Sequence, residues 1–220
     1  MNEQVKSKKR IADHGEVFTA ERQVNAMLDL VKQETERIDS RFLEPACGIG
    51  NFLIEILDRK LSVVEQRYKR NQIEFEKYSI LAISSIYGID ILQDNIIECR
   101  DRLYNLFVEK YKKLFKTKTK TLCEKSARFI LEKNIIHGDA LTLCKVNTDE
   151  PIVFSEWAII SNNLLKRRDF TMDELLNKKL PEYKEEEIPL FTDENDPAFL
   201  PQPFKVYPPI HFLRIGENAE

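Results

Sequence analysis

The stretch Phe42-Leu-Glu-Pro-Ala-Cys-Gly-Ile-Gly-Asn-Phe52 decides the fold, because it joins a short apolar run to an amphipathic segment through two glycines. Residues 41–44 predict a strand that ends at Pro45, and residues 51–61 carry apolar side chains at helical spacing. Gly48 and Gly50 therefore lie in a strand-to-helix turn, where the missing Cβ atoms let a ligand approach the backbone. Dinucleotide-binding turns need a third glycine where this chain has Leu53, which argues against a nicotinamide or flavin site.

Two further apolar runs, residues 86–90 and 134–139, predict strands that end in Asp90 and Asp139. Residues 62–84, 94–115 and 121–133 predict helices between them. This alternation predicts an α/β fold with a Rossmann-like parallel sheet, whose strand ends lie along one edge where ligands bind. Asp90 follows the glycine turn by about 40 residues rather than the usual 20 or so, so one extra helix has to be accommodated.

The two aspartates predict contacts with an adenosine group. A carboxylate at the position of Asp90 accepts hydrogen bonds from both ribose hydroxyls, and one at Asp139 accepts a bond from an adenine amino group. Each acid alone is explained equally well as an ordinary helix N-cap. Together with the glycine turn, they favour an adenosine-bearing ligand.

The run Glu44-Pro-Ala-Cys-Gly-Ile-Gly-Asn-Phe52 resembles the S-adenosylmethionine (SAM) motif of amino-methylating DNA methyltransferases, which is close to (D/E)PACGxGxF. His14-Gly-Glu-Val-Phe-Thr-Ala20 is similar to the other SAM motif of that family, although alanine replaces its usual final proline. This motif order is that of the gamma class, the adenine-N6 enzymes. Tyr87-Gly-Ile-Asp90 and His137-Gly-Asp-Ala140 occupy the places of the next two motifs, so the resemblance covers about residues 14–145.

The resemblance implies a role for each matching residue. Phe18 and Thr19 hold the methionine end of SAM, and Glu44, Gly48 and Gly50 shape the floor of the pocket. Asp90 binds the ribose. The expected set of cofactor-binding residues is completed by Asp139 with Ala140 and Leu141 at the adenine, and by the motif neighbours Pro45, Ala46, Cys47, Phe52 and Ile91. Cys47 is expected to pack and to take no part in catalysis.

The catalytic motif of the family, (D/N/S)-P-P-(Y/F/W), is missing after the third strand. The only Pro-Pro pair is Pro208-Pro209, which follows Tyr207 and precedes Ile210. Ser161-Asn-Asn-Leu164 offers an asparagine after an apolar run but no proline. The sheet of a full methyltransferase of this family has about seven strands, whereas only three are evident here. Nothing in the sequence resembles the target-recognition domain of such an enzyme. The chain therefore has no assigned catalytic residue and resembles the cofactor half of a methyltransferase.

The composition changes after about residue 147, where eight of the nine prolines and many aromatic residues fall. Frequent prolines exclude long regular helices, and frequent aromatics are unlike a disordered tail. We expect residues 148–220 to form an extended arm that packs on this chain or binds a partner. Residues 1–39 are expected to hold a helix capped by Thr19 together with the upstream SAM motif, and residues 40–147 the SAM-binding core.

Bulk properties exclude several classes of protein. The net charge of −3 argues against a strongly basic nucleic-acid binder, although residues 98–133 hold eleven Lys or Arg against five acids. Such a basic helix face is more often solvated than bound to phosphates. The four cysteines show neither metal-ligand nor dense disulfide spacing, which indicates reduced thiols in a cytoplasmic protein. No run approaches the roughly 20 apolar residues needed to span a bilayer, so neither a membrane nor a bound metal is expected.

Three hypotheses remain open. In the first, this chain is the SAM-binding subunit of a split DNA adenine-N6 methyltransferase, and a second subunit carries the Asn-Pro-Pro-Tyr loop and the target recognition for DNA, or for RNA. In the second, it is a catalytically inactive SAM-binding module that assembles a restriction-modification-type complex. In the third, it is a lone methyltransferase acting on RNA, protein or a small molecule through an unrecognised site.

Overall fold

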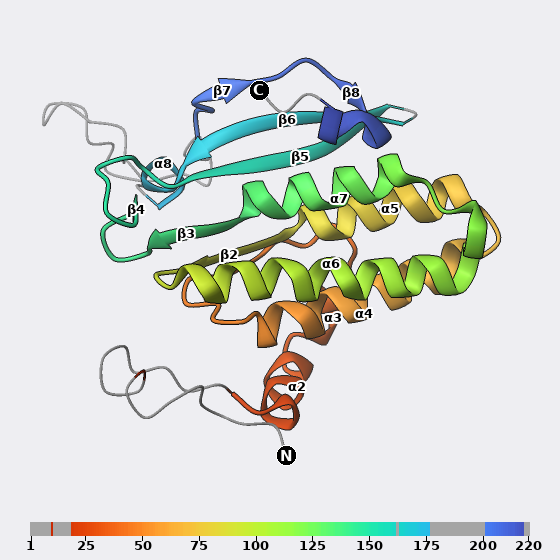
Figure 1. Cartoon of the computed structure of the whole chain (residues 1–220), viewed down its shortest axis with the longest axis horizontal. Helices are drawn as coiled ribbons and strands as arrows, with labels where there is room; N and C mark the ends of the chain where they lie inside the picture. Colours follow the sequence, from red (N-terminus) through yellow and green to blue (C-terminus); the bar gives the residue numbers. More distant parts are fainter. Residues whose placement is uncertain (1–9, 11–18, 162, 177–200, 218–220) are drawn as a thin grey trace, which may run out of the picture.

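The computed structural model describes residue 10 and residues 19–161, 163–176 and 201–217, and the architecture below refers to these residues. It is a mixed α/β structure with a mostly parallel four-stranded sheet, flanking helices and a second, antiparallel sheet (Figure 1). Phe18 lies outside the described residues.

The first sheet has the order β1-β2-β3-β4 and is built from the three predicted strands. β1 (Phe42–Glu44), β2 (Ile86–Asp90) and β3 (Ile135–Asp139) are parallel, with Glu44 opposite Gly88 and Asp90 opposite His137. β4 (Cys144–Lys145) adds a short antiparallel pair to the end of β3. Because β1, β2 and β3 are parallel, their carboxyl ends meet at one border of the sheet, as the sequence predicts. β1 is an edge strand of this sheet.

Four long helices make the bulk of the molecule. They are α4 (Asn51–Tyr68), α5 (Gln72–Ser84), α6 (Gln93–Phe115) and α7 (Thr121–Asn134), and a turn of 3-10 helix, η1 (Lys116–Lys118), joins the last two. α5 leads directly into β2 and α7 into β3, whereas α4 and α6 return along the other face (Figure 1). α5 is the extra helix that the long spacing to Asp90 requires, so this prediction is confirmed.

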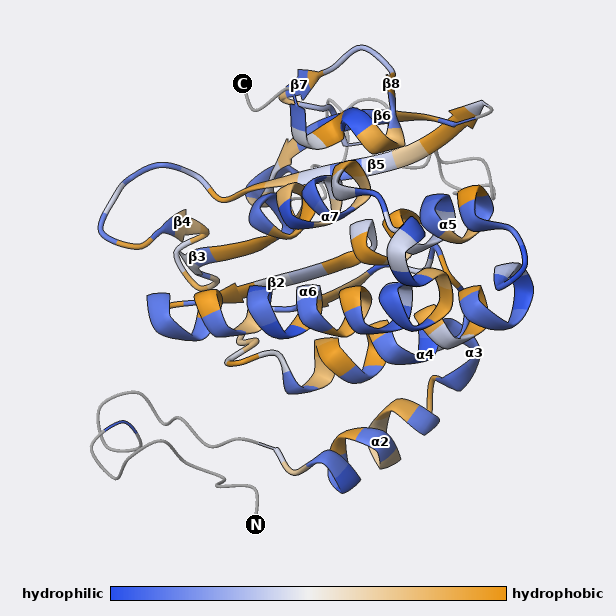
Figure 2. Ribbon diagram, turned by 45° about the vertical axis from the view of Figure 1, so that its right-hand side comes forward, coloured by the Kyte–Doolittle hydropathy of each residue, from blue (hydrophilic) through white to orange (hydrophobic). Residues whose placement is uncertain are grey.

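The helices and the short sheet share one apolar core. Its members include Leu53, Phe75, Ile86 and Phe107, all fully buried. Figure 2 shows hydrophobic residues on the helices and at the start of β3, whose end is hydrophilic. A smaller cluster of Tyr87, Ile89, Ile152, Phe154 and Met172 lies on the other face of β2.

In its described residues, 148–161, 163–176 and 201–217, the C-terminal part is not the extended arm expected from its composition; residues 177–200 of the expected arm lie outside the described residues. β5 (Val153–Ser161) and β6 (Leu164–Thr171) form a long antiparallel hairpin, to which β7 (Lys205–Val206) and β8 (Ile210–His211) add short strands. α8 (Met172–Leu176) follows the hairpin, and η2 (Phe212–Glu217) packs on α7. The hairpin forms because no proline occurs between Pro151 and Pro181, a gap that the average over the whole tail conceals.

The hairpin packs on this chain. Trp157 and Leu165 of the hairpin, with Phe212 and Ile215 of η2, belong to the same core as the four long helices. The Trp157 indole contacts the Phe129 ring edge to face, with the ring centroids 6.3 Å apart, and its Nε1 donates to Asn134 Oδ1. Residues 151–176 and 201–217 therefore complete the fold that the N-terminal half begins.

The N-terminal helices are short. α2 (Glu21–Asp29) begins after Ala20, and no side chain caps its first turn, so the prediction that Thr19 is the N-cap is wrong. α3 (Lys32–Thr35) follows and leads to β1. In the described part of the chain, no helix combines the length and the apolar character that a bilayer-spanning segment requires.

Candidate cofactor site at the strand ends

The glycine turn between β1 and α4 has a backbone that glycine favours. Gly48 has a φ of 52° and Gly50 a φ of 83°, both in the left-handed region that side chains disfavour. The Gly50 N–H donates to Cys47 O at 2.8 Å, and the Cys47 N–H donates to Ile89 O at 2.9 Å. These bonds hold the turn against the end of β2.

Asp90 joins the second strand to this turn. Its carboxylate accepts hydrogen bonds from the Gly48 N–H at 2.9 Å, the Leu92 N–H at 2.8 Å and Asn95 Nδ2 at 3.3 Å. Because a carboxylate has about four acceptor positions, the described residues leave roughly one open on Oδ2. Asp90 thus supports the segment that enters α6, but it is not the N-cap of this helix, because the cap position is Leu92; one acceptor position of its carboxylate stays open.

Asp139 lies at the border of a separate hollow. Its Oδ1 accepts from the Leu141 N–H at 2.8 Å, which fixes the loop after β3. The hollow has a volume of about 500 Å³ and is lined by Ile91 and Asp139 together with the turn after β4. Ile91 is 44% and Leu141 94% exposed, so apolar surface lies beside the carboxylate. His137 Nε2 lies 3.0 Å from Ile91 O and ties the ends of β2 and β3 together.

The remaining motif residues lie around the turn. Glu44 ends β1, and burial raises the pKa of its carboxyl, while a hydrogen bond from the Ala46 backbone acts in the opposite direction. Thr19 O accepts from Asn51 Nδ2 at 3.2 Å, so the segment before α2 lies at the start of α4. Pro45 and Ala46 are exposed, Phe52 packs against the main core, and Ala140 packs against the smaller one.

Cys47 is a buried packing residue in this turn. A hydrogen bond with the Cys99 thiol and burial raise the pKa of the Cys47 thiol far above its ordinary value. The thiol therefore stays protonated at neutral pH, where it is a poor nucleophile.

Two polar residues of α6 support the turn and were not singled out in the sequence. Arg102 Nη1 donates to Ile49 O at 2.6 Å and to Asn51 Oδ1 at 2.8 Å. Asn95 donates to Asp90, as described above. With Cys99 between them, these residues recur at positions i, i+4 and i+7, so they lie on one helix face. This helical spacing is the sequence signal from which Asn95 and Arg102 could have been predicted as supports of the turn. The charge pattern of their helix predicts only a basic, solvated face.

Both degenerate candidates for the catalytic loop lie far from this site. Ser161 and Leu164 border the tip of the β5–β6 hairpin, whereas β5 begins near the end of β3 (Figure 1). Nine extended residues span about 30 Å, which separates the tip from the strand ends. Pro208 and Pro209 precede β8, which pairs with Leu164 and Leu165 near that tip.

The described residues contain no group of three or more His, Cys, Asp or Glu side chains placed to hold a metal ion. Comparisons with protein-family models, with curated proteins and with solved structures found no match to this chain. The assignment of the site therefore depends on its own residues and on their geometry.

Proposed function

We propose that this chain is the SAM-binding subunit of a split DNA adenine-N6 methyltransferase, and that a partner subunit supplies the Asn-Pro-Pro-Tyr loop and reads the DNA. The observation that carries the proposal is the hydrogen bond between the Gly48 N–H and Asp90. It brings the glycine motif and the ribose-binding acid, which lie 42 positions apart in the sequence, to one border of a parallel sheet.

The residues present fit an adenosine sulfonium ligand. The left-handed glycines leave the backbone of the turn open to close approach. Glu44 offers a half-buried carboxylate for the amino group of the methionine part, and Asp90 retains an acceptor for a ribose hydroxyl. Ile91 offers apolar surface for the adenine ring, and Asp139 borders the same hollow with an acceptor for its amino group.

The free edge of β1 supports the need for a second chain. Among the described residues, no strand pairs with the outer edge of β1. The Phe42 N–H donates to Ser85 O of the segment before β2, and in a strand the next residue faces the opposite side, so the peptide groups of Leu43 point to the free edge. The Leu43 side chain is 45% exposed. A strand of the partner that adds here would bring its following loop beside the glycine turn.

The chemistry divides between the two chains. SAM supplies an electrophilic methyl group on a sulfonium. This carbon would accept adenine N6 of the DNA as the electron pair of the C–S bond passes to sulfur, and the N6 proton would pass to an acceptor of the partner or to water. The residues of this chain orient the donor: Glu44 at its amino group, Asp90 at its ribose and Asp139 at its adenine. Fixing two bound substrates in line supplies most of the acceleration.

The test is to isolate the tagged chain with its partner from its host and to assay methyl transfer from tritiated SAM to DNA. The isolated chain should bind SAM and transfer no methyl group, whereas the two-chain complex should form N6-methyladenine, identified by mass spectrometry of the digested DNA. Methylation of DNA by the isolated chain would contradict the split arrangement. A complex that binds SAM but methylates nothing would favour the inactive assembly module.

Leu43→Pro locates the interface, because proline removes a backbone donor from an edge strand without breaking pairing on the other side. The variant should fold and bind SAM, but lose the partner and the methylation activity with it. The matched control is Leu43→Ala, which shortens the same side chain and keeps the N–H. Equal partner binding by both variants would rule out pairing at β1.

A further inference from the structure

A second cleft lies on the other side of the turn that borders the candidate adenine hollow. It has a volume of about 440 Å³ and is enclosed by the end of α7, by β3, by the turn after β4 and by the β5–β6 hairpin. Lys145, Val146 and Thr148 border both spaces, so the turn that carries them is a shared wall. None of the residues expected to bind the cofactor lines this second cleft.

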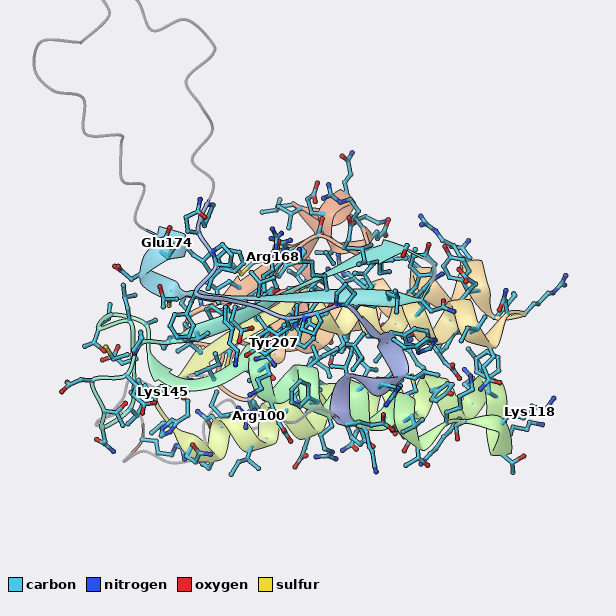
Figure 3. All side chains as sticks on the ribbon, turned by 90° about the horizontal axis from the view of Figure 1, so that it is seen from above. Arg100, Lys118, Lys145, Arg168, Glu174 and Tyr207 are labelled. Atoms are coloured by element: carbon cyan, nitrogen blue, oxygen red, sulfur yellow. The ribbon has the colours of Figure 1, made fainter. Side chains whose placement is uncertain are left out.

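The cleft gathers positive charge. Four basic side chains and two acidic ones line it, giving a formal net charge of +2 with histidine neutral: Arg100, Lys133, Lys145 and Arg167 against Glu132 and Asp169. Figure 3 shows Arg100 and Lys145 toward one end of the molecule, whereas Lys118 projects from the opposite end. Lys118 is therefore remote from the cleft.

One of the two acidic side chains, Asp169, has its carboxylate satisfied by hydrogen bonds within the protein. Asp169 accepts from Arg167 at 2.7 and 2.8 Å, from Ser155 Oγ at 2.7 Å and from Tyr207 Oη at 3.1 Å. The Arg167 side chain is only 10% exposed, and its guanidinium lies 4.2 Å from the centroid of the Tyr207 ring. This buried ion pair forms the back wall of the cleft, and Glu132 at the end of α7 is the other carboxylate that lines it.

The other three basic side chains of the cleft differ in their partners. Arg100 Nε donates to Ile135 O at 2.9 Å and so holds the end of α7, which is a structural role. Lys145 forms an ion pair with Glu150 outside the cleft at 2.7 Å. Lys133 has no hydrogen-bond or ion-pair partner among the described residues, and burial and the nearby Arg167 lower the pKa of its amine. The Lys133 amine lies 5.3 Å from the centroid of the Phe129 ring, a cation–π contact that leaves its three N–H donors available to an anion in the cleft.

We propose that this cleft is a binding site for a small phosphorylated ligand of nucleotide size, distinct from the cofactor site. A phosphate at its mouth would accept from Lys133 and Lys145, and the Thr148 hydroxyl lies on the same border. Ile136, Val146 and Val153 supply apolar wall for a ribose or base. The volume lies within the range of small-molecule pockets. A partly enclosed hollow admits a single phosphate group more readily than a duplex backbone, which needs an open basic surface.

The test is calorimetric titration of the full chain with cytidine 5′-monophosphate, ribose 5-phosphate and, as the phosphate-free control, cytidine. Both phosphorylated probes should bind and cytidine should not. Lys133→Gln and Lys145→Gln should each weaken binding about tenfold, the effect of one lost charge-assisted contact. Lys118→Gln, which removes a surface lysine at the far end, should bind as the parent chain does. Lys133→Gln should melt at most slightly lower than the parent chain, because the fold gives that ammonium a cation–π contact with Phe129 but no hydrogen bond or ion pair among the described residues.

Three results would overturn the proposal. The first is that no phosphorylated probe binds at millimolar concentration, and the second that cytidine binds as well as its monophosphate. The third is that both cleft variants bind normally. A single-stranded oligonucleotide that binds far more tightly than the monophosphate and depends on Lys133 would instead assign the cleft to a nucleic-acid chain. Because neither probe carries a methionine or an adenine, failure of this site would leave the proposed SAM site untouched.

Discussion

Gly50→Ala should destabilise the protein through two separable effects at the glycine turn. The first is conformational: Gly50 has a φ of 83°, and a Cβ in this region costs about 1–2 kcal/mol. The second is steric: an added Cβ would lie 2.6 Å from Cys99 Sγ, which is fully buried on α6. Overpacking of this kind costs about 1–3 kcal/mol. Since alanine also restricts the unfolded chain by about 0.5 kcal/mol, we expect a total loss of roughly 2–4 kcal/mol.

A double-mutant cycle with Cys99→Ala separates the two effects. Cys99→Ala alone removes one buried sulfur and should cost about 1 kcal/mol. It also removes the nearest clash, so that the next atoms lie 3.5 and 3.7 Å away, at ordinary contact distance. The double variant should therefore be more stable than the sum of the single effects by about 1–3 kcal/mol, while the conformational cost remains.

The assay is urea unfolding followed by far-ultraviolet circular dichroism and by the fluorescence of Trp157, the only tryptophan. The four free energies of unfolding close the cycle. Additive single effects, within about 0.5 kcal/mol, would show that Cys99 does not limit the space at Gly50. A loss below about 0.5 kcal/mol for Gly50→Ala would refute the left-handed turn itself.

Three further predictions concern stability and positioning. Lys60 is fully buried and donates to Ile38 O, Ser40 O and Ser85 Oγ, and burial lowers its pKa from 10.5 to about 7. The unfolded chain therefore binds this proton more tightly, so the unfolding free energy should rise by roughly 4–5 kcal/mol between pH 7 and 10.5. Lys60→Met should remove this rise in urea titrations; superimposable pH profiles would contradict it. Phe212→Ala should cost about 3–5 kcal/mol because its ring is fully buried, whereas the exposed Arg214→Ala should change stability by less than about 0.5 kcal/mol. Equal melting temperatures for these two variants would mean that η2 does not pack on α7. Arg102→Ala should accelerate amide hydrogen exchange in residues 48–52, because it removes the bonds to Ile49 O and Asn51 Oδ1. Exchange that remains at the parent rate would refute a supporting role.

Much of the parallel sheet could be predicted from the sequence, because its signals are local. β2 agrees residue for residue with the predicted strand 86–90, and β1 and β3 each begin one residue later than expected. Short apolar runs that end at a turn residue specify buried strands with little help from the rest of the chain. The spacing of Asp90 predicted the extra helix α5, because parallel strands require crossover connections.

The C-terminal sheet was missed because its stability is not local. The hairpin is fixed by long-range contacts, such as Trp157 against Phe129 of α7 and the bond from the Tyr87 hydroxyl to Ser155 O. Neither contact leaves a periodic pattern in the sequence. The prolines that flank the hairpin dominate the composition of residues 148–220, on which the prediction of an extended arm depended. The prediction of Thr19 as N-cap was wrong for a related reason. A capping residue signals only a preference for the helix start, and the cap position lies one residue later, at Ala20.

At the candidate site, the sequence motifs predict which residues contact a ligand, a prediction that stays open, but they do not predict the residues that support the turn. Arg102 and Asn95 support the turn through bonds to the backbone and to Asp90, and their helix is basic on its outer face. The basic cleft was also hidden, because Lys133, Lys145 and Arg167 come from three different elements. Only the topology brings such residues together.

The most direct test of the central claim is calorimetric titration of the full chain with SAM, comparing Asp90→Ala with Asp101→Ala. Each variant removes one carboxylate. Asp90 precedes α6, whereas Asp101 lies within it, on an exposed face, and pairs with Arg128. SAM should bind the parent chain and Asp101→Ala with the same affinity, and Asp90→Ala should bind at least about tenfold more weakly while remaining folded by circular dichroism. Equal SAM affinity for all three proteins, or no SAM binding by the folded parent chain, would contradict a cofactor site at the ends of β1, β2 and β3.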